Sequence, residues 1–437
     1  MKLFRFLILL ILISAVESVY SGPVRPGKVR RLFKRSEVLS KHHVGFALYD
    51  LEKGKQIFGH QEDKYFTPAS NTKLFTFYAG LKMLKDSVPG LQYIERGDSL
   101  IFWGTGDPSL LHPDFAQQPV LRKLAASGRK LFFSPGRYTG DFYGTGWAYD
   151  DYNEYYQPEM GELPVYGNVV RFRVEGGAVT GNVEWSCYEM RTDSQAVQGR
   201  FTIRRDLFSN LFYRPLVPVP AGYRQEIPLR YSTGLSLALL SDTLKKEIGL
   251  VKEAFPGSGA QTWYSVQRDT LFRRMLQPSD NFLAEQILLM CAAENGLEMN
   301  AGKVIAHVRK NFLGSLPDAP QWVDGSGLSR QDLFTPRSMI RLCELIYDEF
   351  EGREAELFDL LPQGGKTGTI RNYFKADKPF VFAKTGTLSN NVNLTGYLVT
   401  KKGKRLAFSF MNNNYTQPTT DIRKEMDRIL TAIYEAN

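Results

Sequence analysis

PASNTKLFTFYAGLKML, at residues 68–84, is an apolar stretch that opens with a proline and predicts a buried helix. Ser70 and Lys73 lie three residues apart in it, so a helix would place both side chains on one face. The start of a helix offers free N–H groups and a positive dipole end beside the serine hydroxyl. A lysine in apolar surroundings can lose its proton and act as a base. The stretch therefore predicts a nucleophile and its base, although a capping serine beside a solvated lysine would explain the same residues.

One other serine, Ser127, has a lysine three residues later, Lys130. It lies next to Gly128 at the end of an expected helix, without an apolar helix to follow it. We therefore expect Ser127 on the surface.

Two further motifs follow in the chain. The first is Ser-Asp-Asn at Ser279–Asn281, between two expected helices, and the second is a Lys-Thr-Gly that ends an expected strand. Each motif is weak evidence alone, since Ser279 could cap a loop and a second Ser-x-Asn occurs at 389–391. Together, S-x-x-K, S-D-N and K-T-G are the signature of class A β-lactamases and penicillin-binding proteins. Three motifs in that order indicate a serine acyl-transfer site.

The tetrapeptide Lys-Thr-Gly-Thr occurs twice, beginning at Lys366 and again at Lys384. The first copy follows Pro362, Gly364 and Gly365, a composition typical of a loop. The second ends the β-rich run PFVFA, which could form a sheet edge beside the nucleophile. A strand edge offers backbone groups to an extended peptide, and a small Thr-Gly lets that peptide approach. We predict that the second copy is the catalytic one.

Six segments resemble the class C low-molecular-mass penicillin-binding proteins, which are D-alanyl-D-alanine carboxypeptidases and endopeptidases. They are PASNTKLFT (68–76), GTGDPSL (104–110), PSDNFLAEQILL (278–289), DGSGLSR (324–330), LPQGGKTGTIRNYF (361–374) and AKTGTLSNNVNLTGY (383–397). The resemblance runs from about residue 40 to the C-terminus and weakens between about 140 and 225. Its members carry a large insertion between the first two motifs.

The resemblance implies a role for each motif residue. Ser70 would attack the carbonyl between two D-Ala residues, with Lys73 as its base and Ser279 relaying a proton to the leaving amine. Asn281 would hold the substrate amide. Substrate binding is also expected from Lys384, Thr385, Gly386 and Thr387, with Lys384 and the two threonines at the terminal carboxylate. The family further implies an oxyanion hole from the backbone N–H groups of Ser70 and Thr387. No cofactor or metal is implied.

The expected fold is α+β: a penicillin-binding, β-lactamase-like transpeptidase domain interrupted by a mostly β insertion. The segment HVGFALYDLEKGKQIFGHQ predicts an N-terminal hairpin, and three β-rich runs precede an amphipathic C-terminal helix. These five strands could complete one antiparallel sheet covered by the first and last helices. The peptidase domain is expected at 36–87 and 262–437. The insertion is expected at 88–261, as two small, mostly β modules.

The first 21 residues predict a secretory signal peptide, because two early basic residues precede an apolar run too short for a membrane span. An uncleaved N-terminal anchor is the alternative. A signal peptide, in combination with the family, places the protein in the periplasm.

Composition limits the other functions. The 437 residues, 43% hydrophobic and 23% charged, are typical of a folded chain of two or three domains. The net charge of +9 could draw an exported protein to an anionic wall polymer or membrane surface, and no concentrated basic block indicates nucleic acid. Neither the three cysteines (Cys187, Cys291, Cys343) nor the five histidines show metal-ligand spacing, and buried free thiols are expected.

Two other classes of function remain open, and a third is weaker. A β-lactamase or an esterase would use the same nucleophile, but the insertion and DGSGLSR favour a peptidase that acts on peptidoglycan stem peptides and is acylated by β-lactams. A non-catalytic wall-binding protein would not need all three motifs. A Ser-His-Asp hydrolase of the G-x-S-x-G type is disfavoured, because the chain has only the near match GLSLA at 234–238.

Overall fold

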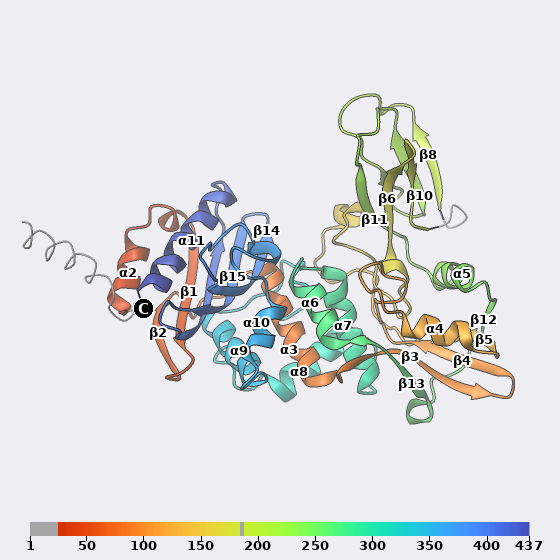
Figure 1. Ribbon diagram of the computed structural model, residues 1–437, viewed down its shortest axis with the longest axis horizontal. Helices are drawn as coiled ribbons and strands as arrows, with labels where there is room; N and C mark the ends of the chain where they lie inside the picture. The colour runs from red at the N-terminus through yellow and green to blue at the C-terminus, as the bar shows by residue number, and fades with distance from the viewer. Residues whose placement is uncertain (1–24, 184–187, 437) are drawn as a thin grey trace, which may run out of the picture.

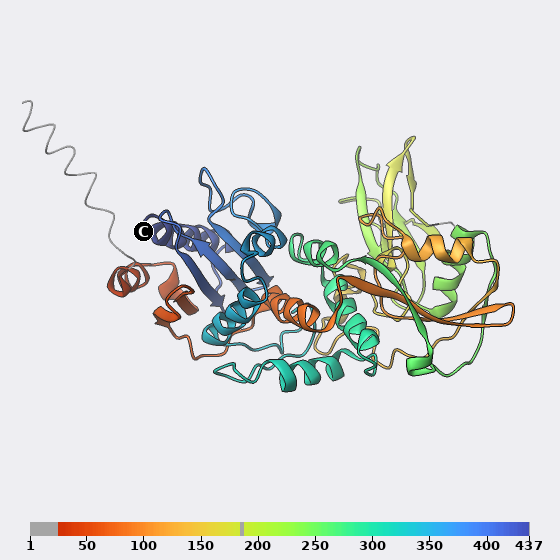
Figure 2. The ribbon, with the colours of Figure 1, turned by 60° about the horizontal axis from the view of Figure 1, so that its bottom comes forward.

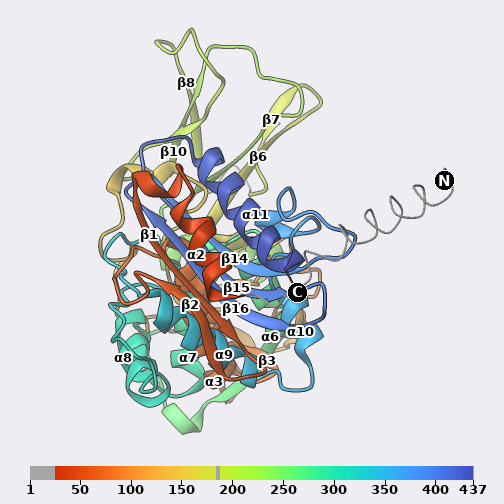
Figure 3. The ribbon, with the colours of Figure 1, turned by 90° about the vertical axis from the view of Figure 1, so that its left-hand side faces the viewer.

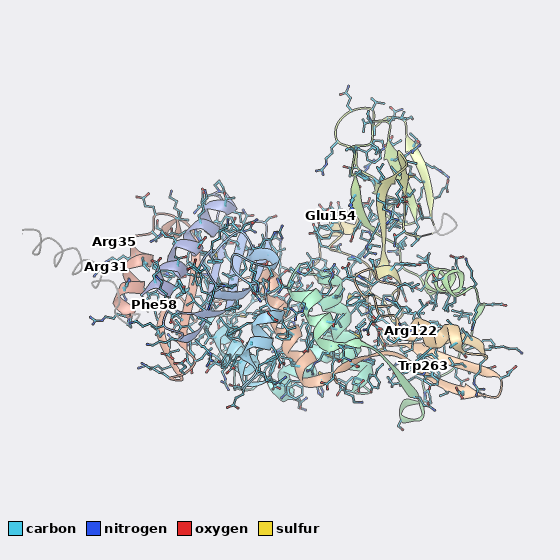
Figure 4. The ribbon with its side chains drawn as sticks, in the orientation of Figure 1. Arg31, Arg35, Phe58, Arg122, Glu154 and Trp263 are labelled. Atoms are coloured by element: carbon cyan, nitrogen blue, oxygen red, sulfur yellow. The ribbon has the colours of Figure 1, made fainter. Side chains whose placement is uncertain are left out.

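The computed structural model describes residues 25–183 and 188–436. The molecule is elongated, with two bodies side by side along its long axis (Figures 1 and 2). One body contains both ends of the described chain, and the other is formed by the insertion. In Figure 4, Arg31 and Arg35 lie at the outer end of the first body, and Arg122 and Trp263 lie within the insertion. The predicted signal peptide lies outside the described residues.

The first body is built on a five-stranded, wholly antiparallel sheet in the order β14-β15-β16-β1-β2. Its strands are β1 (His43–Asp50), β2 (Lys55–His60), β14 (Val381–Leu388), β15 (Asn391–Val399) and β16 (Arg405–Asn413). The N-terminal hairpin joins the C-terminal strands where β1 pairs with β16, in a register that places Phe46 opposite Phe410. This confirms the predicted sheet, whose two parts are far apart in the sequence.

Helices cover both faces of this sheet. On one face α2 (Pro26–Lys34) and α11 (Thr419–Glu435) share a core with Phe46, Phe408 and Phe410. Figure 3 shows these two helices in front of the sheet. On the other face the alternate residues, including Ala47 and Met411, join the core of the helical layer. The predicted apolar stripe of α11 is confirmed, since all its members are buried: Ile422, Met426, Ile429, Leu430 and Ile433.

The helical layer surrounds α7, on which twelve residues are buried. The layer consists of α3 (Lys73–Met83), α6 (Arg268–Leu276), α7 (Asn281–Glu294), α8 (Ala301–Phe312), α9 (Pro336–Asp348) and α10 (Glu354–Leu360). A helix that is apolar all round needs a fully buried position, and α7 has one between α3, α6 and α8. Cys291 and Cys343 are buried free thiols in this core, whereas Cys187 lies outside the described residues.

The insertion contains a five-stranded sheet in the order β12-β5-β4-β3-β13 and two three-stranded sheets, β11-β6-β7 and β8-β10-β9. The strands of the larger sheet are β3 (Ser87–Arg96), β4 (Ser99–Gly104), β5 (Lys130–Phe133), β12 (Ile248–Leu250) and β13 (Gln261–Gln267). The smaller sheets use β6 (Val169–Glu175), β7 (Ala178–Thr180), β8 (Glu189–Asp193), β9 (Arg204–Arg205), β10 (Leu211–Pro215) and β11 (Arg224–Pro228). Two helices, α4 (Pro119–Ala126) and α5 (Thr233–Leu244), complete it.

The insertion is fastened directly to α7. The Gln286 side chain is fully buried, and its amide nitrogen donates to the carbonyls of Gly106 (2.8 Å) and Gly161 (2.9 Å). Gly106 belongs to the GTGDPSL segment, which thereby joins the insertion to the helix that begins at Asn281. Within the described part of the chain, no helix has the length and apolar character needed to span a membrane.

Candidate active site

Three elements meet at the centre of the molecule (Figure 1). Ser70 lies in a short 3-10 helix, η3 (Ala69–Thr72), and Lys73 is the first residue of α3. The Ser-Asp-Asn motif forms the turn into α7, with Asp280 capping that helix. The second Lys-Thr-Gly-Thr lies in β14, the strand at the edge of the sheet. A cleft of about 680 Å³ is lined by residues of all three motifs, including Ser70, Ser279 and Thr387.

Lys73 makes three hydrogen bonds through its side-chain nitrogen. The Nζ atom lies 3.1 Å from Ser70 Oγ, 2.7 Å from Asn281 Oδ1 and 2.7 Å from the carbonyl oxygen of Ser326. A neutral amine has two N–H donors and one lone pair. The two carbonyl-type oxygens can take both donors, which leaves the lone pair for the Ser70 hydroxyl proton. The geometry is that of a base held against a nucleophile.

Burial favours the neutral form of Lys73. The side chain is fully buried, and this desolvation lowers the pKa of Lys73 to about 8, against the charges of Asp324 and Glu285, which raise it. The usual pKa of lysine is near 10.5. At neutral pH, the neutral form of Lys73 is therefore far more populated than that of a lysine on the surface.

Two buried carboxyl groups arrange the chain beneath Lys73. Glu285 accepts the backbone N–H groups of Gly325 (2.9 Å) and Ser326 (2.7 Å), and Asp324 accepts that of Gly327 (2.7 Å). Burial and the nearby Asp324 raise the pKa of Glu285 to about 8. These contacts fix the loop DGSGLSR, whose Ser326 carbonyl reaches Lys73. Sequence reasoning used this segment only for the family resemblance and missed its position beneath the base.

Lys384 forms the second half of the site. Its fully buried Nζ donates to Ser279 Oγ (2.7 Å) and to the carbonyl of Thr385 (2.8 Å). Burial, and then the charge of Lys73, hold the pKa of Lys384 well below its usual value. Ser279 itself has a left-handed backbone, with φ at 70°. Its hydroxyl hydrogen is free to donate while its oxygen accepts from Lys384.

Gly386 lets β14 approach the nucleophile. A Cβ at this position would lie 2.2 Å from the carbonyl oxygen of Pro68 and 3.1 Å from the backbone nitrogen of Asn71. Both atoms belong to the backbone around Ser70, so the strand could not carry a side chain here without moving away. The structure thus contains the close approach that the small Thr-Gly predicts.

The first Lys-Thr-Gly-Thr lies in a loop, and Lys366 is exposed, as expected. The end of the same tetrapeptide, however, reaches the cleft: Thr385 Oγ1 donates to Thr369 Oγ1 at 2.8 Å, and both residues line the cleft. Sequence reasoning missed this contact, because it placed the first copy in a loop and only the second copy in the active site.

The insertion also reaches the site. Asn281 Nδ2 donates to the carbonyl of Tyr156 at 2.9 Å, and Asp151 and Tyr155 line the cleft together with Ser70. Glu154, from the same segment, lies at the junction of the two bodies in Figure 4. Each end of this amide has one further hydrogen-bonding position, so Asn281 can hold a substrate amide while it keeps both bonds.

The alternative pair, Ser127 and Lys130, lies elsewhere. Ser127 caps the end of α4, where its hydroxyl accepts the backbone N–H of Arg129 at 3.2 Å. Lys130 is exposed and forms an ion pair with Asp98 at 2.9 Å. The lysine is therefore not held against the serine as a base.

Several known carboxypeptidases resemble this chain. The chain is 24% identical over 449 residues to penicillin-sensitive carboxypeptidase A of Dictyostelium discoideum, covering 86% of this chain and 83% of that protein. It is also 24% identical to a D-alanyl-D-alanine carboxypeptidase of Actinomadura sp. (strain R39), over 86% of this chain and 78% of that one. The crystal structure of penicillin binding protein 4 (dacB) from Haemophilus influenzae has the same fold, with a TM-score of 0.70 at 19% identity, covering 93% of this chain and 97% of that one. Residues 27–200 and 235–433 match the D-Ala-D-Ala carboxypeptidase 3 (S13) family, and the chain belongs to that family.

Proposed function

We propose that Ser70 is the nucleophile of a serine DD-peptidase that cleaves peptidoglycan stem peptides through an acyl-enzyme. The observation that carries this proposal is the contact between Ser70 Oγ and Lys73 Nζ, in which the other two partners of the lysine take its N–H donors. A base whose lone pair faces a serine hydroxyl is what nucleophilic catalysis requires. Membership of the carboxypeptidase family supports the same chemistry.

In the first half-reaction, Lys73 takes the hydroxyl proton while Ser70 Oγ attacks the carbonyl that joins D-Ala to the next residue. The oxyanion is stabilised by the backbone N–H groups of Ser70 and Thr387, as the family implies. The amide bond then breaks, and Ser279 passes its hydroxyl proton to the leaving amine and regains one from Lys73, which holds the proton that it took from Ser70. Water attacks the remaining ester with Lys73 again as base, which frees Ser70.

Substrate binding falls to the other residues of the cleft. Asn281 holds the amide of the acyl donor, and β14 lies beside the peptide as an added strand edge. Lys384, Thr385 and Thr387 face the terminal carboxylate, and Gly386 allows the close approach. Lys384 also orients Ser279, which its hydrogen bond of 2.7 Å supports. β-Lactams would acylate the same serine; a crystal structure of the Haemophilus influenzae protein is of a complex with a β-lactam.

The cellular setting is part of the proposal. The N-terminal segment 1–21 is a signal peptide, so the mature protein is exported to the periplasm. The net charge of +9 would favour a loose association with the wall or the membrane surface. The peptidase domain consists of 36–87 and 262–437, and the insertion of 88–261. The first limit falls at the start of β3, whereas β13 (Gln261–Gln267) pairs with β3 and extends the sheet of the insertion past the second limit.

Product analysis tests the function directly. Purified wall fragments and a synthetic peptide that ends in D-Ala-D-Ala are incubated with the mature protein, and the products are identified by mass. We expect release of D-Ala, cleavage of cross-linked stem peptides, or both, and no product with Ser70→Ala. Rapid hydrolysis of a β-lactam without any peptide product would instead indicate a β-lactamase. Retention of wall fragments without any cleavage would indicate a binding protein.

A further inference from the structure

The residue that leaves in a DD-peptidase reaction carries a free carboxylate, which needs a cation in the cleft. Lys384 is the expected partner, but its side chain is fully buried and already donates to Ser279 and to the carbonyl of Thr385. Burial and the neighbouring Lys73 favour its neutral form. A neutral amine with its donors engaged binds a carboxylate weakly. Another cation in the cleft is therefore needed to bind this carboxylate.

Arg423 can supply the cation for this carboxylate. It lies near the start of α11, is partly buried, and lines the same cleft as Ser70. Its Nη2 donates to Thr387 Oγ1 at 3.2 Å, so it touches the Lys-Thr-Gly-Thr element itself. Arginine keeps its charge at every physiological pH. Over residues 25–183 and 188–436, no acidic side chain forms an ion pair with it.

The two threonines of β14 differ in what they can offer. They are two residues apart on a strand and so share one face. The Thr385 hydroxyl donates its proton in a hydrogen bond to Thr369 Oγ1, at 2.8 Å. Thr387 accepts from Arg423, so its own hydroxyl proton is free to donate. Thr387 and Arg423 together therefore present a hydroxyl donor and a guanidinium beside each other, a pair suited to one carboxylate.

We propose that Arg423 recognises the carboxylate of the leaving residue and makes the protein selective for peptides in which that carboxylate is free. This inference rests on the proposed function. The other arginine of the cleft, Arg330, donates to the carbonyl of Ser389 at 3.3 Å, beyond the end of β14. Arg330 is the alternative cation for this carboxylate, because it lies in the same cleft. In this structure, however, it does not contact the Lys-Thr-Gly-Thr element.

The test compares two substrates rather than one. Diacetyl-L-Lys-D-Ala-D-Ala and its C-terminal carboxamide differ only in the charge of the leaving residue. We measure kcat/KM for both with the unaltered protein and with Arg423→Gln, Arg423→Lys, Arg330→Gln and Lys424→Gln. Lys424 is exposed, adjacent on the same helix, and outside the cleft, so its variant controls for the loss of one positive charge.

We expect Arg423→Gln to lower kcat/KM for the carboxylate peptide by roughly 10- to 100-fold, the range for a lost hydrogen bond to a charged group. The carboxamide should change by no more than about twofold. Arg423→Lys should retain part of the preference, because it keeps the charge but not the forked donors. Lys424→Gln should keep both rates.

Other outcomes would overturn the proposal. Equal losses on both peptides would make Arg423 a structural support for Thr387, and an unchanged preference would remove its role. If Arg330→Gln abolished the preference while Arg423→Gln kept it, Arg330 would be the carboxylate residue. Absence of both peptide cleavage and penicillin acylation in the unaltered protein would reject the proposed function, and with it this inference.

Discussion

Gly386→Ala adds a single methyl group at the point where β14 passes the nucleophile. The new Cβ would lie 2.2 Å from the carbonyl oxygen of Pro68, whereas ordinary contact begins near 3.4 Å. The obstructing atom is backbone and cannot rotate away, so β14 must retreat by about 1 Å. That movement carries Lys384 and Thr387 away from Ser70. Misplacement of about 1 Å in an active site can lower the rate by roughly 100-fold.

The assay is the rate of acylation by a fluorescent penicillin, with thermal melting to check the fold. We expect acylation of Gly386→Ala to be roughly 100-fold slower, and its free energy of unfolding to fall by about 1–3 kcal/mol, as is usual for overpacking. Gly314→Ala is the matched control, because a Cβ there meets no atom within 4 Å. Acylation of Gly386→Ala within about twofold of the unaltered protein would show that the close approach of β14 is not needed.

Three further predictions concern the lysines. Lys73→Ala should keep the fold and lower the acylation rate by roughly 100-fold or more, the scale of a lost general base; an unchanged rate would assign the base elsewhere. Because Lys73 acts as a base only when neutral and its pKa is about 8, the acylation rate should rise with pH and reach half its maximum near pH 8. If the acylation rate stayed constant between about pH 6 and about pH 9.5, Lys73 would not be the base. Lys384→Ala should impair acylation because it releases Ser279, whereas Lys366→Ala should change it little, since Lys366 is exposed; the reverse result would exchange the two copies.

Much of the peptidase body could be predicted from local sequence patterns. The hairpin of β1 and β2, the three C-terminal strands and the stripe on α11 each depend on periodicity within a short segment. The motifs beginning at Ser70, Ser279 and Lys384 could be recognised because each carries its own residue types at a fixed spacing. The structure brings all three to one cleft.

The missed features all depend on the path of the chain through space. No pattern around Glu285 shows that the loop of Ser326, 41 residues further along the chain, turns its carbonyl toward Lys73. The contact between Tyr156 and Asn281 requires knowing how the insertion folds back onto α7. Thr369 was missed for a related reason. It contacts Thr385 because its loop pairs with β14, and the sequence around Thr369 does not show that pairing.

The insertion was the hardest part to anticipate. Its larger sheet contains parallel pairs, β4 with β5 and β5 with β12, which require long connections between partners. Short β-rich runs in the sequence indicate strands but not such an order.

The central claim is that Ser70 is the residue that becomes acylated. Its most direct test is to label the protein with a penicillin, digest it, and locate the adduct by mass spectrometry of the peptides. We expect a single adduct on the peptide that contains Ser70, lost in Ser70→Ala while the thermal melting temperature is kept. An adduct on Ser127, on Ser279 or on any other residue, or undiminished labelling of Ser70→Ala, would contradict it.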